Sequence, residues 1–491
     1  MIPDQNHTLS YKVKGIIWPL MVIIAFILAN VVCIAYDQWA ISLVPAAIII
    51  FLFIFVYPDK ALLVLAFCTP FSRQIELADM GLGISLPSEP ILIVFLMLFW
   101  LRLVITGQFD LQISKHPITI ILFTQTLWVL VTSLSSTMPL VSIKFFISRL
   151  WFITSFYLIG SYYYKKPSFI LAFVMAFVVS MLFPIGYAWS RHVNHNFNQA
   201  YSSKALVPYF SDHGIYAVVL TMFIPFLAII AFYGGRLHKN NLYRIFAATL
   251  LGIFLLALVW SYTRAAWIGM ACATILFIIL RLKIKFRQVV FMLLFALVGL
   301  AFLQNTIYEK LRENKTVSQS KKDDVNKVLK SVTNISTDAS NTERINRWKS
   351  AFRMWKEKPI LGWGPGTYMF QYASYQLSSE MTIISTRGGN LGNAHSEYIG
   401  PLVEQGVLGC LFMVLLLFVM LYYGMKLVYS DLPDEFRYLA MAALLGLTTY
   451  FIHGFLNNYL DVDKAASPFY ALLGMLCAID IQYKGSKGLL N

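Results

Sequence analysis

Apolar residues run along this chain in long stretches that short polar connections separate. The stretches recur from Gly15 to Ile481, and most approach the roughly 20 residues that a helix needs to cross a bilayer. Backbone groups inside lipid must be satisfied within the segment, so such stretches predict transmembrane helices. The predicted spans are 15–36, 39–57, 60–71, 87–107, 117–134, 141–162, 167–188, 213–233, 242–260, 264–281, 286–304, 407–427, 435–456 and 466–482.

The expected fold class is all-α: a polytopic helical membrane protein of about 12–14 transmembrane helices with one large, partly helical periplasmic loop. The stretch 60–71 is too short for an ideal span. We expect it to be a tilted, broken or re-entrant helix that ends at Pro70, and we count it as a crossing.

Composition excludes several other classes. Of the 491 residues, 58% are hydrophobic and only 13% are charged, whereas soluble domains carry about 25% charge. This excludes a water-soluble globule, a disordered chain, and a soluble enzyme with a single anchor. The aromatic content of 15% fits belts of Trp and Tyr at the two membrane surfaces.

Charge and cysteine content refine this picture. The net charge is +15, and the basic residues of most short connections fall on one side if both termini are cytoplasmic. We therefore expect contacts with anionic membrane lipid and no nucleic-acid binding. The five cysteines lie in or beside apolar stretches without a CxxC pair, so we expect neither a disulfide framework nor structural zinc.

Loop lengths divide the chain into three regions. Residues 1–304 hold eleven predicted spans and an outer connection at 189–212, residues 305–394 form a large periplasmic loop, and residues 395–491 hold the last spans. Within the large loop, the polar stretch Glu313–Ser340 is expected to be flexible. A capping box formed by Ser340 and Glu343 starts a helix that Lys358-Pro359 ends, and a glycine-rich turn follows over 362–366.

Few ionisable residues interrupt the spans, and intramembrane charges are functional candidates. Lys144 and Arg149 lie within 141–162, but no carboxylate lies at mid-span, which argues against an ion-coupled transporter. The topology brings further candidates to the outer side: Arg191, Asp212, His213, Arg264, Arg347 and His395. Arginine forks suit phosphate groups, and a histidine suits proton transfer near neutral pH.

Each candidate also has a purely structural interpretation. Arg191 and Arg264 could anchor helices at the interface, Arg149 could pair with a carbonyl, and Arg347 could lie on a solvated helix face. Asp212 and His395 could cap the helices that follow them. Residue chemistry alone therefore predicts only an outward-facing, cation-lined membrane site.

Three motifs together resemble the O-antigen ligase and polymerase family. The first is Ser-Tyr-Thr-Arg264-Ala-Ala-Trp267, a turn between two spans. The second runs from Arg347-Trp348 to Pro359-Ile-Leu-Gly362-Trp-Gly364-Pro-Gly366. The third is Asn393-Ala-His395-Ser-Glu-Tyr398, followed by Glu404-Gln-Gly406-Val-Leu-Gly409. The resemblance covers roughly Tyr209 to Ser467 in detail.

The resemblance implies an inverting glycan transfer at the periplasmic face of the bacterial inner membrane. The implied partners are an undecaprenyl-diphosphate-linked glycan donor, an acceptor hydroxyl and membrane lipid, with no metal or other cofactor. Arg191 and Arg264 would stabilise the departing diphosphate, with Arg149 or Lys144 as deeper contacts. His395 would orient or deprotonate the acceptor hydroxyl. The remaining implied site residues are Arg347, Asp212, His213, Asn393, Glu397, and Asp461 or Asp463.

The identity of the acceptor stays open at this point. A ligase would transfer to lipid A–core, a polymerase to another lipid-linked repeat unit, and a protein O-glycosylation enzyme to Ser or Thr. We favour the ligase, because the histidine segment resembles the ligase form best. A transporter or flippase for lipid-linked sugar is the alternative from another class.

Overall fold

The computed structural model describes residues 21, 23–36, 39–77, 82–107, 109–237, 241–295, 298–299, 339–382, 385 and 392–488. The chain divides into two compact units, Met1–Ala61 and Leu62–Asn491. The first unit contains an apolar helix at Ile23–Ala35 and α2 (Val44–Val56), preceded by a 3₁₀ turn at Trp39–Leu43. These helices match the predicted spans 15–36 and 39–57 over their described parts.

The second unit is a bundle of long helices, which confirms the predicted polytopic all-α class. Among the described residues, nine helical segments are long and apolar enough to cross a membrane. They comprise α4 (Ser88–Thr106), α6 (Pro117–Leu134), the continuous α7 (Pro139–Phe152), π-helix (Ile153–Ile159) and α8 (Gly160–Tyr163), α9 (Pro167–His192), α11 (His213–Leu237), α12 (Asn241–Trp260), α13 (Arg264–Arg281), α19 (Gly406–Val428) and α21 (Asp463–Gly488).

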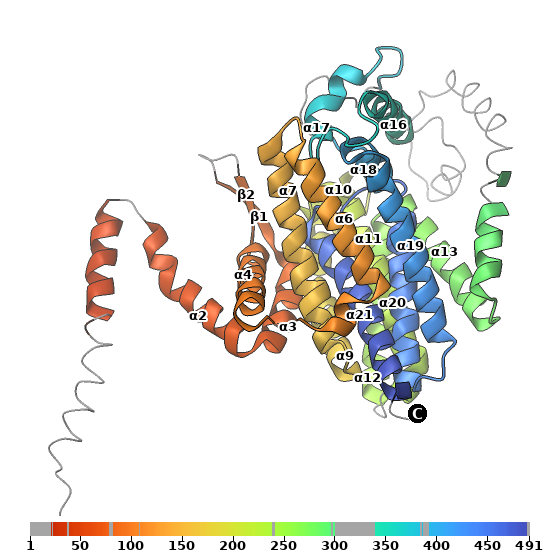
Figure 1. Ribbon diagram of the computed structural model, residues 1–491, viewed down its shortest axis with the longest axis horizontal. Helices are drawn as coiled ribbons and strands as arrows, with labels where there is room; N and C mark the ends of the chain where they lie inside the picture. The colour runs from red at the N-terminus through yellow and green to blue at the C-terminus, as the bar shows by residue number, and fades with distance from the viewer. Residues whose placement is uncertain are drawn as a thin grey trace, which may run out of the picture. The chain divides into compact units, whose positions relative to one another are not determined.

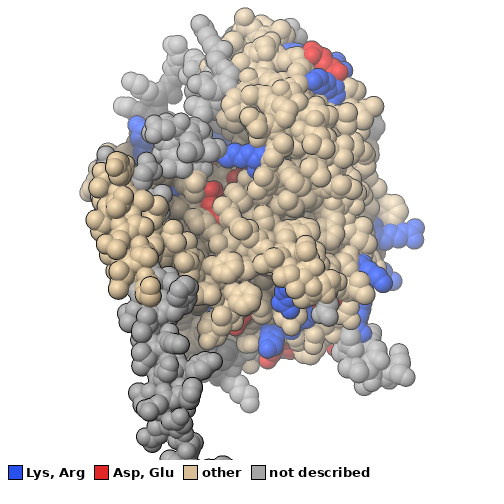
Figure 2. Space-filling view, turned by 60° about the vertical axis from the view of Figure 1, so that its left-hand side comes forward, with Lys and Arg blue, Asp and Glu red and all other residues tan. Residues whose placement is uncertain are grey.

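One further long helix, α20 (Asp434–His453), packs against α11, α13, α19 and α21. The predicted bounds of these ten segments agree with the structure within four residues, except at the end of α21, which extends to Gly488, six residues beyond the predicted end. Figure 2 shows a face of the molecule on which Lys, Arg, Asp and Glu are few and scattered, with some basic and acidic side chains next to one another. Such a surface suits contact with lipid.

Some of the shorter elements lie together at one end of the bundle, and others lie in connections elsewhere. Figure 1 places α16, α17 and α18 together at the end opposite the C-terminus. These and the other short elements are α5 (Leu111–Ser114), α10 (Ser202–Leu206), α16 (Ala339–Glu357), α17 (Tyr368–Gln371), α18 (Ile399–Glu404), a helix at Phe286–Phe295, and 3₁₀ turns at Thr69–Phe71, Val193–His195, Gln199–Tyr201 and Tyr372–Tyr375.

The structure differs from the sequence-based expectation before α4. The predicted segment 60–71 is α3 (Pro58–Cys68), which has 11 residues and at 1.5 Å per residue reaches only about 16 Å. It is too short to cross a bilayer alone. A hairpin that the sequence analysis did not predict follows it, with β1 (Arg73–Leu77) antiparallel to β2 (Leu82–Leu86) and Ile75 opposite Ile84.

Of the large loop, the structure describes residues 339–382, 385 and 392–394, so the prediction of flexibility for Glu313–Ser340 lies almost wholly outside the described residues. Helix α16 already includes Ser340, so the predicted cap at Ser340 is not the start of this helix. The predicted stop at Lys358-Pro359 is confirmed, because α16 ends at Glu357. Gly362, Gly364 and Gly366 of the turn have φ angles of 70°, 111° and 74°. Residues with a side chain rarely adopt such values.

Helix α20 lies deep in the bundle, and glycines allow its neighbours to approach. A Cβ atom added at Gly446 would lie 2.4 Å from the Met222 carbonyl oxygen of α11. One added at Gly269 of α13 would lie 2.9 Å from the Thr449 carbonyl oxygen of α20. Small residues at helix crossings bring backbones together and maximise van der Waals contact in membrane bundles.

Gly446→Ala is expected to destabilise the bundle, because the added methyl group collides with backbone rather than with a movable side chain. Overpacking of this kind costs roughly 1–3 kcal/mol. The measurement is the thermal unfolding of purified protein in detergent. Gly252→Ala in α12, where an added Cβ meets nothing within 4 Å, is the matched control. Equal melting temperatures for both variants would contradict this packing.

Orientation is tested by the reactivity of single introduced cysteines. Ser378→Cys lies near α17, and Lys285→Cys follows the far end of α13; both positions are exposed. If the end bearing α16–α18 faces outward, a membrane-impermeant maleimide labels Ser378→Cys in intact spheroplasts and Lys285→Cys only after permeabilisation. The parent protein with its five native cysteines gives the background. The reverse pattern would overturn the orientation.

Candidate functional site

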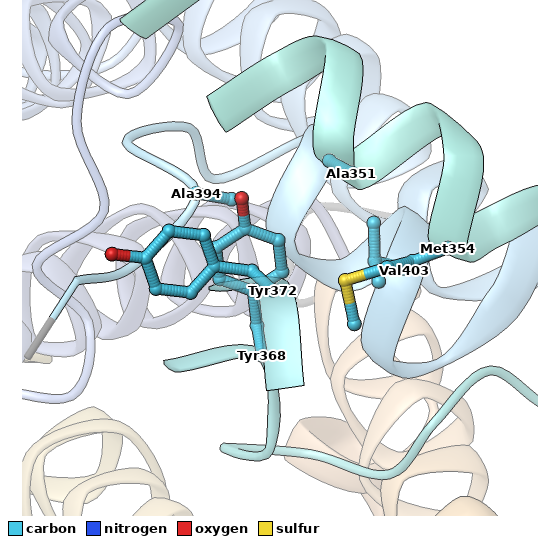
Figure 3. Close-up of a cluster of buried hydrophobic side chains, with 6 residues drawn as sticks. All are labelled: Ala351, Met354, Tyr368, Tyr372, Ala394 and Val403. Atoms are coloured by element: carbon cyan, nitrogen blue, oxygen red, sulfur yellow. The ribbon is translucent and has the colours of Figure 1, made fainter. Parts of the chain in front are cut away.

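The segment that carries His395 is anchored by its neighbour. Ala394 is buried in a small apolar cluster at the end of the bundle that bears α16–α18 (Figure 3). The cluster members are Ala351 and Met354 of α16, Tyr368 and Tyr372, Ala394, and Val403 of α18. The two tyrosine rings stack with their centroids 5.1 Å apart. This packing fixes the backbone immediately before His395.

His395 itself has an unusual backbone and a neutral side chain. Its φ angle is 48°, a left-handed conformation that is uncommon for residues with a side chain and that often occurs at functional sites. Asn393 stabilises this turn, because its Oδ1 accepts the His395 N–H at 3.1 Å. Burial, together with Arg347 and Arg344, lowers the pKa of His395 to about 4, although Asp212 opposes this shift. The imidazole is therefore uncharged at pH 7.

Arg347 points into the protein rather than toward solvent. Its Nε donates to Glu343 Oε1 at 2.9 Å, and its Nη1 donates to the Asn393 carbonyl oxygen at 3.0 Å. A Cβ atom at Gly392 would lie 1.8 Å from Nη1, so the loop passes directly against the guanidinium. Arg347, predicted as a substrate contact, is buried here and supports the backbone of the His395 segment.

Glu397 is also turned inward. Its Oε1 accepts hydrogen bonds from the Tyr450 hydroxyl at 2.7 Å and from the backbone N–H groups of Tyr459 at 2.7 Å and Leu460 at 3.0 Å. In addition, the Glu397 N–H donates to the Gly454 carbonyl oxygen at 2.7 Å. Glu397, one of the predicted site residues, thus joins the connection between α20 and α21 to the His395 segment.

Asp212 and His213 meet that connection at the start of α11. The Tyr459 hydroxyl donates to Asp212 Oδ2 at 2.5 Å, and His213 Nδ1 lies 3.0 Å from Asp212 Oδ1. Burial favours the neutral acid, but His213 and Tyr459 outweigh it and hold the pKa of Asp212 below its ordinary value. Asp212 also binds the Gly214 N–H, so its predicted capping role and its place in the site coincide.

The turn that carries Arg264 lies against the same region. Thr263 Oγ1 donates to the His213 carbonyl oxygen at 3.3 Å, and the Tyr262 hydroxyl donates to the Phe197 carbonyl oxygen at 2.7 Å. Arg264 is half-buried and begins α13. The structure therefore brings the Arg264 turn to the start of α11, as the predicted topology required.

Arg191 is placed differently from the prediction. It lies in the last turn of α9, which extends to His192, and not in a loop. Its Nη1 donates to the Val207 carbonyl oxygen at 2.6 Å, and its guanidinium stacks over Tyr187 and Tyr201. Among the described residues, no hydrogen bond or ion pair joins Arg191 to the Asp212 or His395 side chain.

A small cavity lies near Arg191, on the inner side of the outer connection. It has a volume of about 10 Å³ and is lined by residues that include His192, Tyr216 and Ser261, so it holds at most one water molecule. None of the three residues predicted as catalytic, His395, Arg264 and Arg191, lines it. The cavity is not a glycan site.

Arg149 and Lys144 lie on different faces of α7. The Arg149 side chain is buried, and its Nη2 lies 3.8 Å from Oδ1 of Asp461, which is 48% exposed. Lys144 is exposed, because five positions on a helix separate side chains by about 140°. Arg149 also precedes the π-helix at Ile153–Ile159, an element frequent at functional sites. Only Arg149 of this pair reaches Asp461.

Three residues that the sequence analysis did not select belong to this region. The Nε of Arg344 donates to the Leu456 carbonyl oxygen at 3.1 Å, and the charge of Arg344 helps to lower the pKa of His395. Tyr459 bridges to Asp212. Glu404 accepts the Tyr368 N–H at 3.0 Å, and burial raises the pKa of Glu404 to about 8. Arg344 could have been found from its place one turn before Arg347 on the same helix; Tyr459 gave no sequence signal.

The electrostatic character of the site comes from arginine and histidine side chains around carboxylates. Within the described ranges, no group of three His, Cys, Asp or Glu side chains could hold a metal ion. The sequence-based expectation of metal-independent chemistry stays a prediction.

The fold and this region define a class: a polytopic membrane protein whose polar site lies at one end of an apolar helix bundle. Residues 247–414 match the family model described as O-antigen ligase, which confirms the resemblance to the O-antigen ligase family. The match supports a glycosyltransferase-like enzymatic role. It contains Arg264, Arg347 and His395, whereas Asp212 precedes it and Asp461 follows it. The search of curated proteins gave no significant match.

Glu397→Ala is expected to lower stability, because it leaves the Tyr459 and Leu460 N–H groups without their acceptor. Each unsatisfied buried group costs roughly 1–3 kcal/mol. The measurement is thermal unfolding in detergent. Glu397→Gln keeps an oxygen acceptor at the same position and should retain most of the stability. A Glu397→Ala protein as stable as the parent would contradict the fastening role.

Proposed function

We propose that this protein is a membrane glycosyltransferase that moves a glycan from undecaprenyl diphosphate to an acceptor hydroxyl. The observation that carries the proposal is the His395 segment: a neutral, partly buried imidazole on a strained backbone, near the charges of Arg344 and Asp212. The family match over 247–414 supports the same chemistry. We place the reaction at the periplasmic face of the bacterial inner membrane.

The position of the site suits the two halves of such a donor. A polyprenyl chain is too apolar to leave the bilayer, and a glycan is too polar to enter it. The candidate residues lie where α11, α13 and α21 begin and α20 ends, next to the extramembrane helix α16. A donor can therefore keep its tail in lipid while its diphosphate meets the polar end of the bundle.

The chemical step is a displacement at the anomeric carbon. The acceptor oxygen forms a bond to that carbon and its hydroxyl proton passes to a neighbouring basic group, while the bond to the diphosphate oxygen breaks and the diphosphate leaves with the electron pair. Fixed arginines stabilise the negative charge that grows on the leaving group. We assign this role to Arg264 and Arg344, with Arg149 beside Asp461 as a deeper contact.

Other candidates receive supporting roles in the proposal. Arg191 holds the outer connection through Val207 and two tyrosines, so we assign it the positioning of that connection. Arg347, Asn393 and Glu397 hold the His395 segment. His395, as a neutral imidazole, hydrogen-bonds the acceptor hydroxyl. We favour lipid A–core as the acceptor.

His395→Ala and Arg264→Ala are expected to reduce glycan transfer by at least ~10²-fold, as the loss of a polar catalytic group typically does. The assay incubates purified protein with undecaprenyl-diphosphate-linked glycan and an acceptor, and measures both polyprenyl diphosphate and glycosylated product. Arg281→Ala, at the opposite end of α13, is the matched control and should keep its activity.

The same assay distinguishes the alternative functions. Lipid A–core, a second lipid-linked repeat unit and a Ser/Thr peptide are supplied separately as acceptors. Product with only one of them identifies a ligase, a polymerase or a protein glycosylation enzyme, respectively. Movement of lipid-linked glycan across vesicles without product would indicate a flippase and overturn the proposal.

A further inference from the structure

The Asp212 carboxylate is held from both sides. Its Oδ2 accepts the Tyr459 hydroxyl at 2.5 Å, and its Oδ1 lies 3.0 Å from His213 Nδ1. Tyr459 is in turn fixed through its backbone N–H to Glu397. The carboxylate therefore has a set position relative to both the His213 ring and the segment that carries His395.

This arrangement determines which His213 nitrogen carries hydrogen. His213 and Tyr459 oppose the effect of burial and keep the pKa of Asp212 below its ordinary value, so the carboxylate is ionised and can only accept hydrogen bonds. With Nδ1 protonated, both this carboxylate and Ser203 Oγ can accept its hydrogen. In the neutral ring Nε2 keeps its lone pair, which makes it the atom that can accept a proton.

Ser203 does not convert this pair into a hydrolase-like triad. Its Oγ lies 2.5 Å from His213 Nδ1, the same nitrogen that contacts Asp212. In a Ser-His-Asp triad the serine and the carboxylate contact different ring nitrogens. The serine is therefore not the group that Nε2 would activate, and Nε2 has no hydrogen-bond partner among the described residues.

The surroundings of His395 and His213 differ in burial and in the charges near each ring. His395 has a pKa of about 4, and its Nδ1 is buried without a hydrogen-bond partner in the described structure. Protonation of His395 would place a charge beside Arg344 and Arg347. His213 is 36% exposed and faces an ionised carboxylate, which stabilises the imidazolium that proton transfer creates.

We infer that His213, oriented by Asp212, is the general base that accepts the proton of the acceptor hydroxyl, while His395 positions that hydroxyl. The inference rests on the proposed transferase function. The O–H bond breaks and its proton moves to His213 Nε2 as the oxygen bonds to the anomeric carbon. The carbon–oxygen bond to the diphosphate breaks in the same step, and the imidazolium then returns its proton to water or to the released diphosphate.

A purely structural role for the pair predicts different behaviour. Asp212 binds the Gly214 N–H at the start of α11, so the pair could simply cap that helix. A cap contributes to stability and does not depend on a basic nitrogen at Nε2. Replacement of the missing imidazole by free imidazole separates the two roles, because free imidazole can restore proton transfer but cannot rebuild a cap.

The experiment measures glycan transfer by purified His213→Ala protein, with and without added imidazole. General acid–base catalysis typically contributes ~10²–10⁴-fold, so kcat should fall by at least ~10²-fold with little change in KM for the donor, and imidazole should restore part of it. His195→Ala removes another histidine of the same outer connection, one that stacks on Tyr201, and should leave kcat unchanged.

Asp212→Asn is the second variant, in case His213→Ala fails to fold. Asparagine keeps the shape and the capping oxygen but permits the wrong ring tautomer, so kcat should fall while thermal stability is retained. Unchanged kcat in either variant, or a loss in His213→Ala that imidazole does not restore, overturns the inference. If wild-type protein transfers glycan to no acceptor, the proposed function itself fails, which is a separate result.

Discussion

The buried carboxylate of Glu397 joins the segment that carries His395 to the connection between α20 and α21. A carboxylate taken out of water is costly unless hydrogen bonds replace its hydration. Here Tyr450 and the backbone N–H groups of Tyr459 and Leu460 supply them. Because Glu397 lies two residues after His395, and Tyr459 binds Asp212, this one group sets where His395 stands relative to the start of α11.

Different contacts stabilise the helix bundle and its polar end. Within the bundle, glycines such as Gly446 allow α20 to approach α11 at backbone distance, which increases van der Waals contact between the helices. At the polar end, the apolar cluster around Ala394 fixes the loop backbone. Short segments attached to helix ends therefore hold the candidate site residues.

The charged residues of this end fall into two groups. Arg347 and Glu343 form a buried pair that supports the loop, and Arg347 has little access to any ligand. Arg264, Arg344, Asp212 and His213 are partly exposed and can meet a substrate. In the proposed function, arginine therefore serves both support and chemistry, and burial separates the two uses.

Sequence reasoning predicted the membrane fold well because hydrophobic length is a local property. It identified the ten long helices of the second unit, and it selected His395, Arg264 and Asp212 because their motifs lie next to span ends. It missed the hairpin at 73–86, whose five-residue strands lack a pattern long enough to compete with the helical spans around it. It also placed Arg191 in a loop, although α9 continues to His192.

By itself the sequence determined the class of protein, the family resemblance and the set of polar residues available at one membrane face. It could not determine which of them point inward, because burial depends on contacts between residues hundreds of positions apart, such as Tyr459 and Asp212. Only the tertiary structure shows that Arg347 and Glu397 point inward and that His213 stays partly exposed beside the Asp212 carboxylate. The physical reason is that side-chain direction and protonation are set by neighbours in space, which a linear pattern does not contain.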